Sequence, residues 1–248
     1  MKKAVAKTME FSSEIDNPLF LSYVESAMRG MDIKIVSFKS LLLVVFPVSA
    51  IVIREGEADK DEKDFLLSLR LKTLLAPTSM RLSLPGYKAS QRSLMIATPE
   101  SFRKKERDKR LKVLRNIDDF KQLFALYRKI SEMDGCFDAD EDDENAARFL
   151  NQSYPFAAVA LVENGRALSA AYISRAESTL PMITAVATEP GERKKGYATS
   201  VVSELMDISF NENRIKKLAL WCIDKEAEGI YRALGFKEDS KWIHFKEE

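Results

Sequence analysis

Residues 186–199 constrain the fold more strongly than any other part of the chain. They read Val-Ala-Thr-Glu-Pro-Gly-Glu-Arg-Lys-Lys-Gly-Tyr-Ala-Thr. In this pattern an apolar strand stops before a proline, a basic turn follows, and an amphipathic helix begins near Gly196. A helix N-terminus leaves backbone N–H groups unpaired and carries partial positive charge. The sequence therefore predicts an α/β chain with an anion site at this turn, where a phosphate-bearing ligand is the expected occupant.

The side chains of the turn suit this ligand. Gly196 lets a phosphate approach the backbone closely, and Ala198 keeps the next turn of the helix narrow. Arg193, Lys194 and Lys195 would add charge-assisted contacts, and an arginine can make two of them at once. We therefore expect the turn and the helix start to bind the phosphates together.

Cysteine and histidine are scarce, which excludes several kinds of chemistry. The two cysteines, Cys136 and Cys222, cannot build a disulfide framework or a four-cysteine zinc site. The single histidine, His244, rules out the two-histidine metal signatures. We expect no metal site and no nucleophile activated by histidine.

The composition is typical of a soluble globular chain, with 46% hydrophobic and 31% charged residues. The longest apolar run, residues 41–53, is interrupted by Pro47 and Ser49. It is too short for a membrane helix, which needs about 20 residues. No apolar stretch of signal-peptide length follows the charged N-terminus. We expect a cytoplasmic protein without a membrane segment.

The net charge of +1 conceals an asymmetry. Residues 1–107 hold 18 basic and 13 acidic side chains, whereas residues 108–248 hold 21 and 25. Between the two parts, residues 101–115 carry eight Lys and Arg side chains and form the natural linker. This stretch could bind nucleic acid, but it has no interleaved aromatic residues for base stacking. A solvated linker is the favoured interpretation.

Hydrophobic periodicity predicts a smaller α/β domain in residues 1–107 and a second α/β unit in residues 108–248. The second unit reads as a mixed, mostly antiparallel central sheet with flanking helices, and Asn164-Gly165 predicts a tight hairpin in it. Strands are expected over residues 33–38, 41–46, 50–54, 93–97, 111–114, 156–162, 167–174, 180–188, 217–223 and 242–245. Helices are expected over residues 17–28, 61–71, a segment beginning at 116, a segment after the acidic residues 138–144, 197–210 and 226–234.

Two segments carry a resemblance to a known family. Residues 193–198, Arg-Lys-Lys-Gly-Tyr-Ala, resemble the Arg/Gln-x-x-Gly-x-Gly/Ala loop of the GNAT superfamily of N-acetyltransferases. Residues 230–236, Ile-Tyr-Arg-Ala-Leu-Gly-Phe, resemble its Tyr-x-x-x-Gly-Phe segment, which follows the loop by about 35 residues. The resemblance covers residues 111–245 and leaves the first 107 residues unexplained.

The resemblance implies a GNAT-like fold and an N-acetyltransferase that uses acetyl-CoA, or another acyl-CoA, as cosubstrate. A primary amine on a small molecule or a peptide would attack the thioester directly in a ternary complex. Tyr231 would be the general acid that protonates the departing thiolate, although packing in the core is the alternative interpretation of this side chain. The residues implied in cosubstrate binding are Val186 and Thr188 through their main chain, Arg193, Lys194, Lys195, Gly196, Tyr197, Ala198 and Thr199 in the loop, and Asp224.

Asp224 departs from the family pattern, in which an asparagine often contacts the pantetheine arm. An aspartate keeps the acceptor oxygen but lacks the amide donor and adds a charge. No general base is assigned: Glu189 is expected to face solvent, and Glu177 or an acid between 134 and 144 could act through water. The acidic residues 138–144 would attract a cationic amine, or they simply enrich a helix N-terminus in acids, as the helix dipole favours.

Two other functions stay open at this point. A CoA-binding regulatory module without an acceptor site is compatible with Asp224 and with the absence of a carboxylate in residues 180–188. Nucleic-acid binding through residues 103–115 is the less favoured alternative. The first 107 residues could be a degenerate copy of the same fold, a substrate-shaping domain or the surface of a homodimer.

Overall fold

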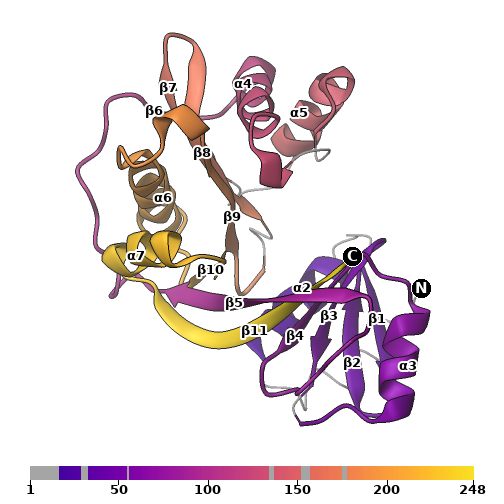
Figure 1. The fold of residues 1–248 in the computed structure, drawn as a ribbon. Coiled ribbons are helices and arrows are strands. Elements are labelled where there is room, and N and C mark those ends of the chain that lie inside the picture. Colours follow the sequence, from indigo (N-terminus) through magenta and orange to yellow (C-terminus); the bar gives the residue numbers. More distant parts are fainter. Residues whose placement is uncertain (1–16, 29–32, 55, 134–136, 152–156, 175–177) are drawn as a thin grey trace.

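The computed structural model describes residues 17–28, 33–54, 56–133, 137–151, 157–174 and 178–248. One mixed sheet contains strands from both halves of the described chain. Its strand order is β1-β2-β3-β4-β11-β5-β10-β9-β8-β7-β6. Most neighbouring strands are antiparallel, and helices flank the sheet (Figure 1). The expected fold class, a mostly antiparallel mixed sheet with flanking helices, is confirmed.

The first half of the chain builds one end of this sheet. Three antiparallel strands are followed by a helix and by a strand parallel to the third. A further helix, α2, caps this end, and Asn17 Oδ1 accepts a hydrogen bond from the Phe20 N–H at its start, 3.0 Å away. The elements are α2 (Pro18–Met28), β1 (Lys34–Phe38), β2 (Leu41–Val45), β3 (Ser49–Ile53), α3 (Lys60–Ser68) and β4 (Thr73–Pro77).

The second half repeats this order at the other end of the sheet. A short strand and two helices precede an antiparallel meander, after which a helix leads to a strand parallel to the third of the meander. The elements are β6 (Leu111–Val113), α4 (Ile117–Tyr127), α5 (Asp142–Leu150), β7 (Ala158–Glu163), β8 (Arg166–Ser174), β9 (Met182–Thr188), α6 (Tyr197–Asp207), β10 (Leu218–Cys222) and α7 (Lys225–Leu234).

Two long strands join the halves by crossing between them. β5 (Tyr87–Ala97) comes from the first half but pairs with β10, and β11 (Lys237–Glu247) comes from the second half but pairs with β4. The two strands also pair with each other along ten registered positions. The sheet therefore continues across the predicted domain boundary at residue 107 (Figure 1).

The helices divide between the two faces of the sheet. One face buries a core with α6 and α7, and on the same side a second core packs with α3. The other face carries α4 and α5 at one end and α2 at the other. Alternation in β5 places Leu94 toward α2 and Met95 toward α6, as the two-residue period of a strand requires.

The basic segment before the second half lies along α6. Lys104 Nζ is 2.6 Å from Asp207 Oδ2, and Arg107 Nε is 2.8 Å from Glu204 Oε1. The Lys105 N–H also donates to Ser203 Oγ. Part of the linker charge is therefore used in contacts with the protein itself, which agrees with the linker interpretation more than with a nucleic-acid surface.

Several expected elements correspond closely to the structure, and three do not. The hairpin at Asn164-Gly165 is present, with positive φ values of 50° and 73°. β4 was not predicted, and β5 and β11 each extend over 11 residues where short strands were expected. β5 begins Tyr-Lys-Ala-Ser-Gln-Arg-Ser, and this polar stretch has no alternation of apolar residues by which a strand is recognised.

Candidate active site

A cleft opens where two parallel strands separate. β9 and β10 register at only one pair, Met182 with Ala219, and diverge beyond it. The cleft between them has a volume of about 550 Å³. It is lined by the end of β9, the following loop, the first turn of α6, the end of β10 and the start of α7. The cleft thus brings together residues as far apart in the sequence as Ile130 and Tyr231.

A β-bulge in β9 exposes main chain to this cleft. Ala187 pairs with Ala170 and Thr184 with Tyr172, so Ala185 and Val186 together oppose a single residue of β8. Ala185 has a positive φ of 54°, which is unusual for a residue with a side chain. Val186 and Thr188, whose main chain was predicted to meet the cosubstrate, both line the cleft.

The loop after β9 ends in a helix N-terminus without a side-chain cap. Gly196 occupies the N-cap position of α6 in the left-handed conformation, with φ of 81°, and no side chain caps the helix. Lys194 also has a positive φ, 64°. The first turn contains no acidic residue. The backbone N–H groups at the start of α6 therefore have no side-chain acceptor, and no acidic side chain in the first turn offsets the positive end of the helix dipole at the cleft.

The three basic residues of the loop are placed differently. Arg193 and Lys194 line the cleft, whereas Lys195 is not among its lining residues. Lys195 Nζ lies 2.8 Å from Glu192 Oε2, which raises the pKa of the lysine and lowers that of Glu192. Lys194 is largely exposed, and its nearest carboxylate, Glu226, is 3.9 Å away. Lys194 is the freer cation of this pair.

Arg110 was missed by the sequence interpretation, which assigned it to the linker. Its guanidinium lies 4.9 Å from the ring centroid of Tyr197, and Nη1 is 3.3 Å from the tyrosine hydroxyl. Asp108 and Glu163 also hold this arginine. The network fixes Tyr197 at the first position of α6, beside the basic loop of residues 193–195.

Tyr231 lies at the inner side of the cleft and is 7% exposed. Its ring packs edge-on against Phe236 within the core that contains α6 and α7. Burial raises the pKa of the phenol far above its ordinary value, and the nearby Cys222 and Asp224 add to this effect. The hydroxyl therefore stays protonated at neutral pH, so that the residue has both a packing role and an available proton.

Asp224 uses its carboxylate as a helix cap. Its Oδ1 accepts a hydrogen bond from the Ala227 N–H, 2.7 Å away, at the start of α7. The same residue lines the cleft. An aspartate is therefore explained at this position by the needs of α7, independently of any contact with a ligand.

Replacing Asp224 by alanine should lower the free energy of unfolding by about 1 kcal/mol, because the α7 cap is lost. Asp224→Asn should stay within about 0.5 kcal/mol of the wild type, since asparagine caps helices as well as aspartate does. Urea denaturation of the two variants measures this difference. Equal losses in both would show that the charge, and not the cap, stabilises α7.

The base candidates do not converge on the cleft. Glu189 was expected to face solvent, but its side chain is only 17% exposed. Lys129 Nζ lies 3.1 Å from Glu189 Oε1, and Arg166 Nε lies 3.4 Å from Glu189 Oε2. Glu189 is not a lining residue, and Glu177 lies outside the described residues. Of the carboxylates that do line the cleft, Asp224 caps α7, while Glu192 and Glu226 face the two lysines of the loop.

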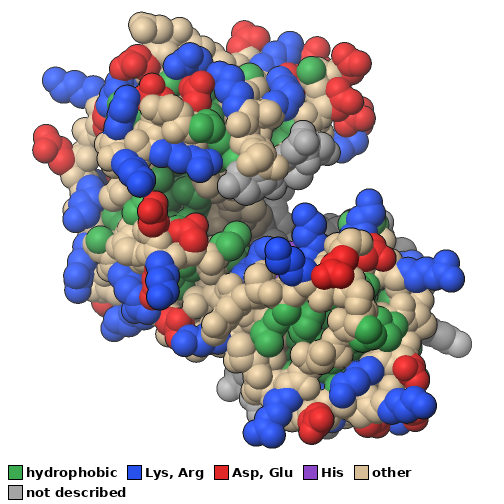
Figure 2. All heavy atoms as spheres, in the orientation of Figure 1, with side chains coloured by type: hydrophobic (Ala, Val, Ile, Leu, Met, Phe, Trp, Pro, Cys, Tyr) green, Lys and Arg blue, Asp and Glu red, His purple; other side chains and the backbone are tan. Residues whose placement is uncertain are grey.

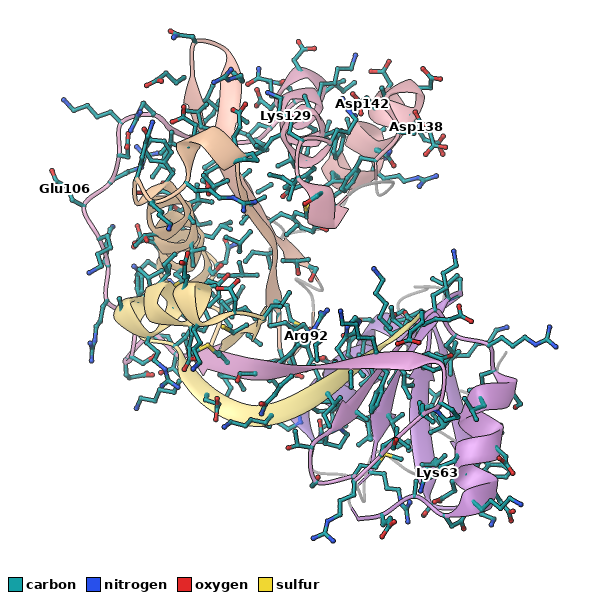
Figure 3. All side chains as sticks on the ribbon, viewed as in Figure 1. Lys63, Arg92, Glu106, Lys129, Asp138 and Asp142 are labelled. Atoms are coloured by element: carbon teal, nitrogen blue, oxygen red, sulfur yellow. The ribbon has the colours of Figure 1, made fainter. Side chains whose placement is uncertain are left out.

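The acidic segment 138–144 mostly stabilises its own helices. Asp142 makes a two-pronged ion pair with Arg128, at 2.7 and 2.9 Å, and Asp143 pairs with Lys121. Asp138 accepts from the Asp140 N–H at 3.2 Å. Figure 3 shows Asp138 and Asp142 beside α5, at the α4–α5 end of the molecule. These contacts favour the interpretation of the segment as an acid-rich helix start.

Sequence interpretation also missed Trp221, Ile130 and Met133, which line the cleft from β10 and from the segment that follows α4. No motif marks them, because apolar side chains at a cleft resemble core residues in a sequence. In the described part of the chain no helix is long and apolar enough to cross a membrane. No cluster of metal-ligating side chains is found among those residues either.

All residues that line the cleft lie within a segment that matches a known protein family. Residues 117–236 match the model of the acetyltransferase (GNAT) family, which places the splayed strands, the loop and Tyr231 inside the matched region. Residues 117–236 form a GNAT domain. The GNAT resemblance predicted for the C-terminal part is therefore confirmed. No curated protein matches the chain.

Solved structures share the fold over both halves. A GCN5-related N-acetyltransferase from Kribbella flavida is 15% identical, with a TM-score of 0.63, and the match covers 92% of this chain and 95% of that one. A GCN5-related N-acetyltransferase-like protein from Streptococcus suis 89/1591 is 12% identical, with a TM-score of 0.65 and full coverage of both chains. A tandem GNAT protein from the clavulanic acid biosynthesis pathway is 9% identical, with a TM-score of 0.52, over 83% of this chain and 77% of that one.

Proposed function

We propose that this GNAT domain is an acetyl-CoA-dependent N-acetyltransferase that acts on a primary amine of a small molecule or a peptide. The observation that carries the proposal is the single cleft that joins the uncapped α6 N-terminus, the bulged main chain of β9 and the protonated Tyr231. These are a site for phosphate, a row of backbone donors and acceptors, and a proton donor.

The residues present suit this cosubstrate. The α6 N-terminus, Arg193 and Lys194 would hold its pyrophosphate, because Gly196 presents no Cβ at the cap and no side chain competes for the N–H groups. The bulge at Ala185 and Val186 frees main-chain groups to pair with the pantetheine amides. When bound, acetyl-CoA supplies an activated acetyl group as a thioester.

The chain's own contribution to the reaction is positioning and proton transfer. Main-chain N–H groups near Val186 would stabilise negative charge on the thioester oxygen as the amine attacks. Tyr231 would donate its proton to the departing sulfur, and burial keeps that proton in place beforehand. The carboxylates of the cleft are engaged as described above, so we propose that the proton of the amine leaves to solvent. The amine must then enter neutral or lose its proton in the cleft.

We also propose that the first half is a degenerate copy of the same fold, without a cosubstrate site. Its strand order repeats that of the second half, but β3 and β4 register at three pairs and do not separate as β9 and β10 do. The start of α3 is also closed to anions. Asp59 and Glu62 form a reciprocal capping box there, and Asp61 adds another negative charge.

Binding of acetyl-CoA tests the proposed function most directly. Calorimetric titration should detect saturable binding, and Lys194→Gln should weaken it about fivefold, the effect of roughly 1 kcal/mol from an exposed charged contact. Lys195→Gln removes the same charge one residue further on, where Glu192 already holds the lysine. It should change the affinity less than about twofold.

Equal weakening in the two variants would indicate that overall charge, rather than contact with Lys194, attracts the ligand. Absence of acetyl-CoA binding by the wild-type protein would refute the proposed function. Binding without release of free CoA across a broad panel of amines would instead support a regulatory CoA-binding module.

A further inference from the structure

On the face of the sheet that carries α2, α4 and α5, α2 covers Leu94 and Trp242, which are 2% and 3% exposed, and α4 and α5 cover the other end. Figure 2 shows the surface hollowed between the two halves of the molecule, on the line of β9, β10, β5 and β11 in Figure 1. Trp221 of β10 lines the cleft and meets Trp242 of β11 edge-on, with ring centroids 5.6 Å apart. Trp242 itself is buried beneath α2, so the aromatic pair links the wall of the cleft to the core of the first half.

Arg92 lies on the same face of the sheet as Trp242. It is registered directly opposite Trp242, and side chains of directly opposed residues share a face of the sheet. Leu94, two residues further along β5, is registered opposite Trp221. At about 3.3 Å per residue, the position of Arg92 in β5 lies about 7 Å along the strand from that of Leu94, beside which Trp221 lines the cleft. Figure 3 shows Arg92 between the two halves.

The guanidinium of Arg92 has no counter-charge among the described residues. No carboxylate there lies within ion-pair distance, and Nη2 instead contacts His244 Nδ1 at 3.0 Å. Burial, Arg92 and Lys246 lower the pKa of His244 to about 4, so the ring is neutral at pH 7 and accepts a hydrogen bond from the arginine. Nε of Arg92 is buried and has no partner.

Partial burial of an unpaired cation lowers the stability of the folded state unless a counter-ion or hydrogen-bond acceptor replaces the water that the cation loses. Desolvation lowers the pKa of Arg92, and no neighbouring anion opposes this effect. Trp221 is partly exposed and presents flat apolar surface to the cleft, which suits the body of a small organic molecule better than it suits a free ion. The missing partner is therefore expected to be the anionic group of a ligand that also reaches the cleft.

We propose that Arg92 binds an anionic group, a carboxylate or a phosphate, on the acceptor amine, whose body lies against Trp221 in the cleft. The inference rests on the proposed function, because it names the acceptor class of the same reaction. Amino acids, short peptides with a free C-terminus and phosphorylated amines have this chemistry. A simple polyamine lacks the group and would leave Arg92 unpaired.

Intrinsic fluorescence tests this inference without any turnover. Trp221 lines the cleft and Trp242 is registered opposite Arg92, and the chain has no other tryptophan, so emission reports on this place alone. The probes are N-acetylglycylglycine, its C-terminal amide and inorganic phosphate. We expect a saturable change with N-acetylglycylglycine or with phosphate, and none with the amide. Arg92→Gln should weaken the response at least tenfold, as expected for a hydrogen-bonded charge pair.

Two variants control for overall charge and for folding. Lys88→Gln removes an exposed cation from the same strand and should leave the response unchanged. Arg92→Lys keeps the charge without the planar fork and should retain part of the response. An equal response to acid and amide, an unchanged response in Arg92→Gln, or no response to either anion would overturn the inference. An unchanged unfolding temperature in Arg92→Gln would make the first two results unambiguous.

Acetyl-CoA titration of the same preparations separates this inference from the proposed function. A protein that binds acetyl-CoA but shows no Arg92-dependent fluorescence change would keep the proposed function and lose the acceptor class. A protein with the fluorescence change but no acetyl-CoA binding would keep the anion site and lose the proposed function.

Discussion

Phenylalanine in place of Tyr231 is expected to reduce kcat for amine-dependent CoA release by about 10²- to 10⁴-fold, the usual contribution of a positioned general acid. The variant removes only the hydroxyl and keeps the ring that packs against Phe236. Folding and the affinity for acetyl-CoA should therefore be preserved. Release of free CoA thiol measures the rate, and calorimetry measures the affinity.

A second tyrosine provides the matched control. The Tyr87 hydroxyl donates to the Leu71 carbonyl at 2.6 Å in the first half of the molecule, away from the cleft. Tyr87→Phe should leave kcat unchanged. Unchanged turnover in Tyr231→Phe would remove this residue from the mechanism, and its role would then be packing alone.

The pH profile gives an independent check on Tyr231. The pKa of the phenol lies above its ordinary value of 10.0, mainly because of burial. A general acid acts in its protonated form, so turnover should not decline through this group below pH 10. A fall in kcat at lower pH that disappears in Tyr231→Phe would contradict the assignment.

Alanine at Gly235 should lower the free energy of unfolding by about 3 kcal/mol or more, which places it among the severe single substitutions. Gly235 ends α7 with φ of 103°, a conformation that residues with a side chain rarely adopt. A Cβ added there would also overlap the main-chain carbonyl of Ser101 and approach Phe102 Cα to 3.2 Å. Neither obstacle is a flexible side chain, so the backbone itself would have to move.

Gly229 is a control in the same helix. It lies inside α7 with open space around its added Cβ, and alanine should stabilise the protein there by about 0.5–1 kcal/mol. Denaturant unfolding of both variants measures the contrast. Gly235→Asn separates the two causes, because asparagine tolerates a positive φ. If conformational strain dominates, Gly235→Asn should lower the free energy of unfolding only slightly. If the contact with Ser101 dominates, the loss should equal that of Gly235→Ala. Wild-type stability in Gly235→Ala would refute the close approach.

Local sequence predicted those parts of the site that depend on neighbouring residues. The switch from strand to basic turn to helix in residues 186–199 indicated the uncapped helix start, because caps and helix dipoles are properties of a few consecutive residues. The same holds for Asn116, whose side chain accepts from the Asp119 N–H at the start of α4. The GNAT resemblance added Tyr231, through a motif on the helix after the next strand.

Contacts between distant segments were not predictable in this way. The polar strands β5 and β11 lack apolar alternation, and each pairs with a strand of the other half more than 100 residues away. Glu189 was expected in solvent, but Lys129 and Arg166, from two other elements, hold it. Such pairings depend on which elements become neighbours, and periodicity contains no information about that.

The sequence by itself determined that residues 186–199 would form a strand, a basic turn and an uncapped helix start within an α/β chain, because short-range backbone geometry sets this outcome. Only the tertiary structure decided that the two halves share one sheet and that β9 and β10 separate to open a cleft beside Tyr231. It alone brought Arg92 and His244, 152 positions apart, to within 3.0 Å of each other on the face of the sheet that also carries Trp242. The physical reason is that strand pairing and burial act between residues without regard to their separation along the chain.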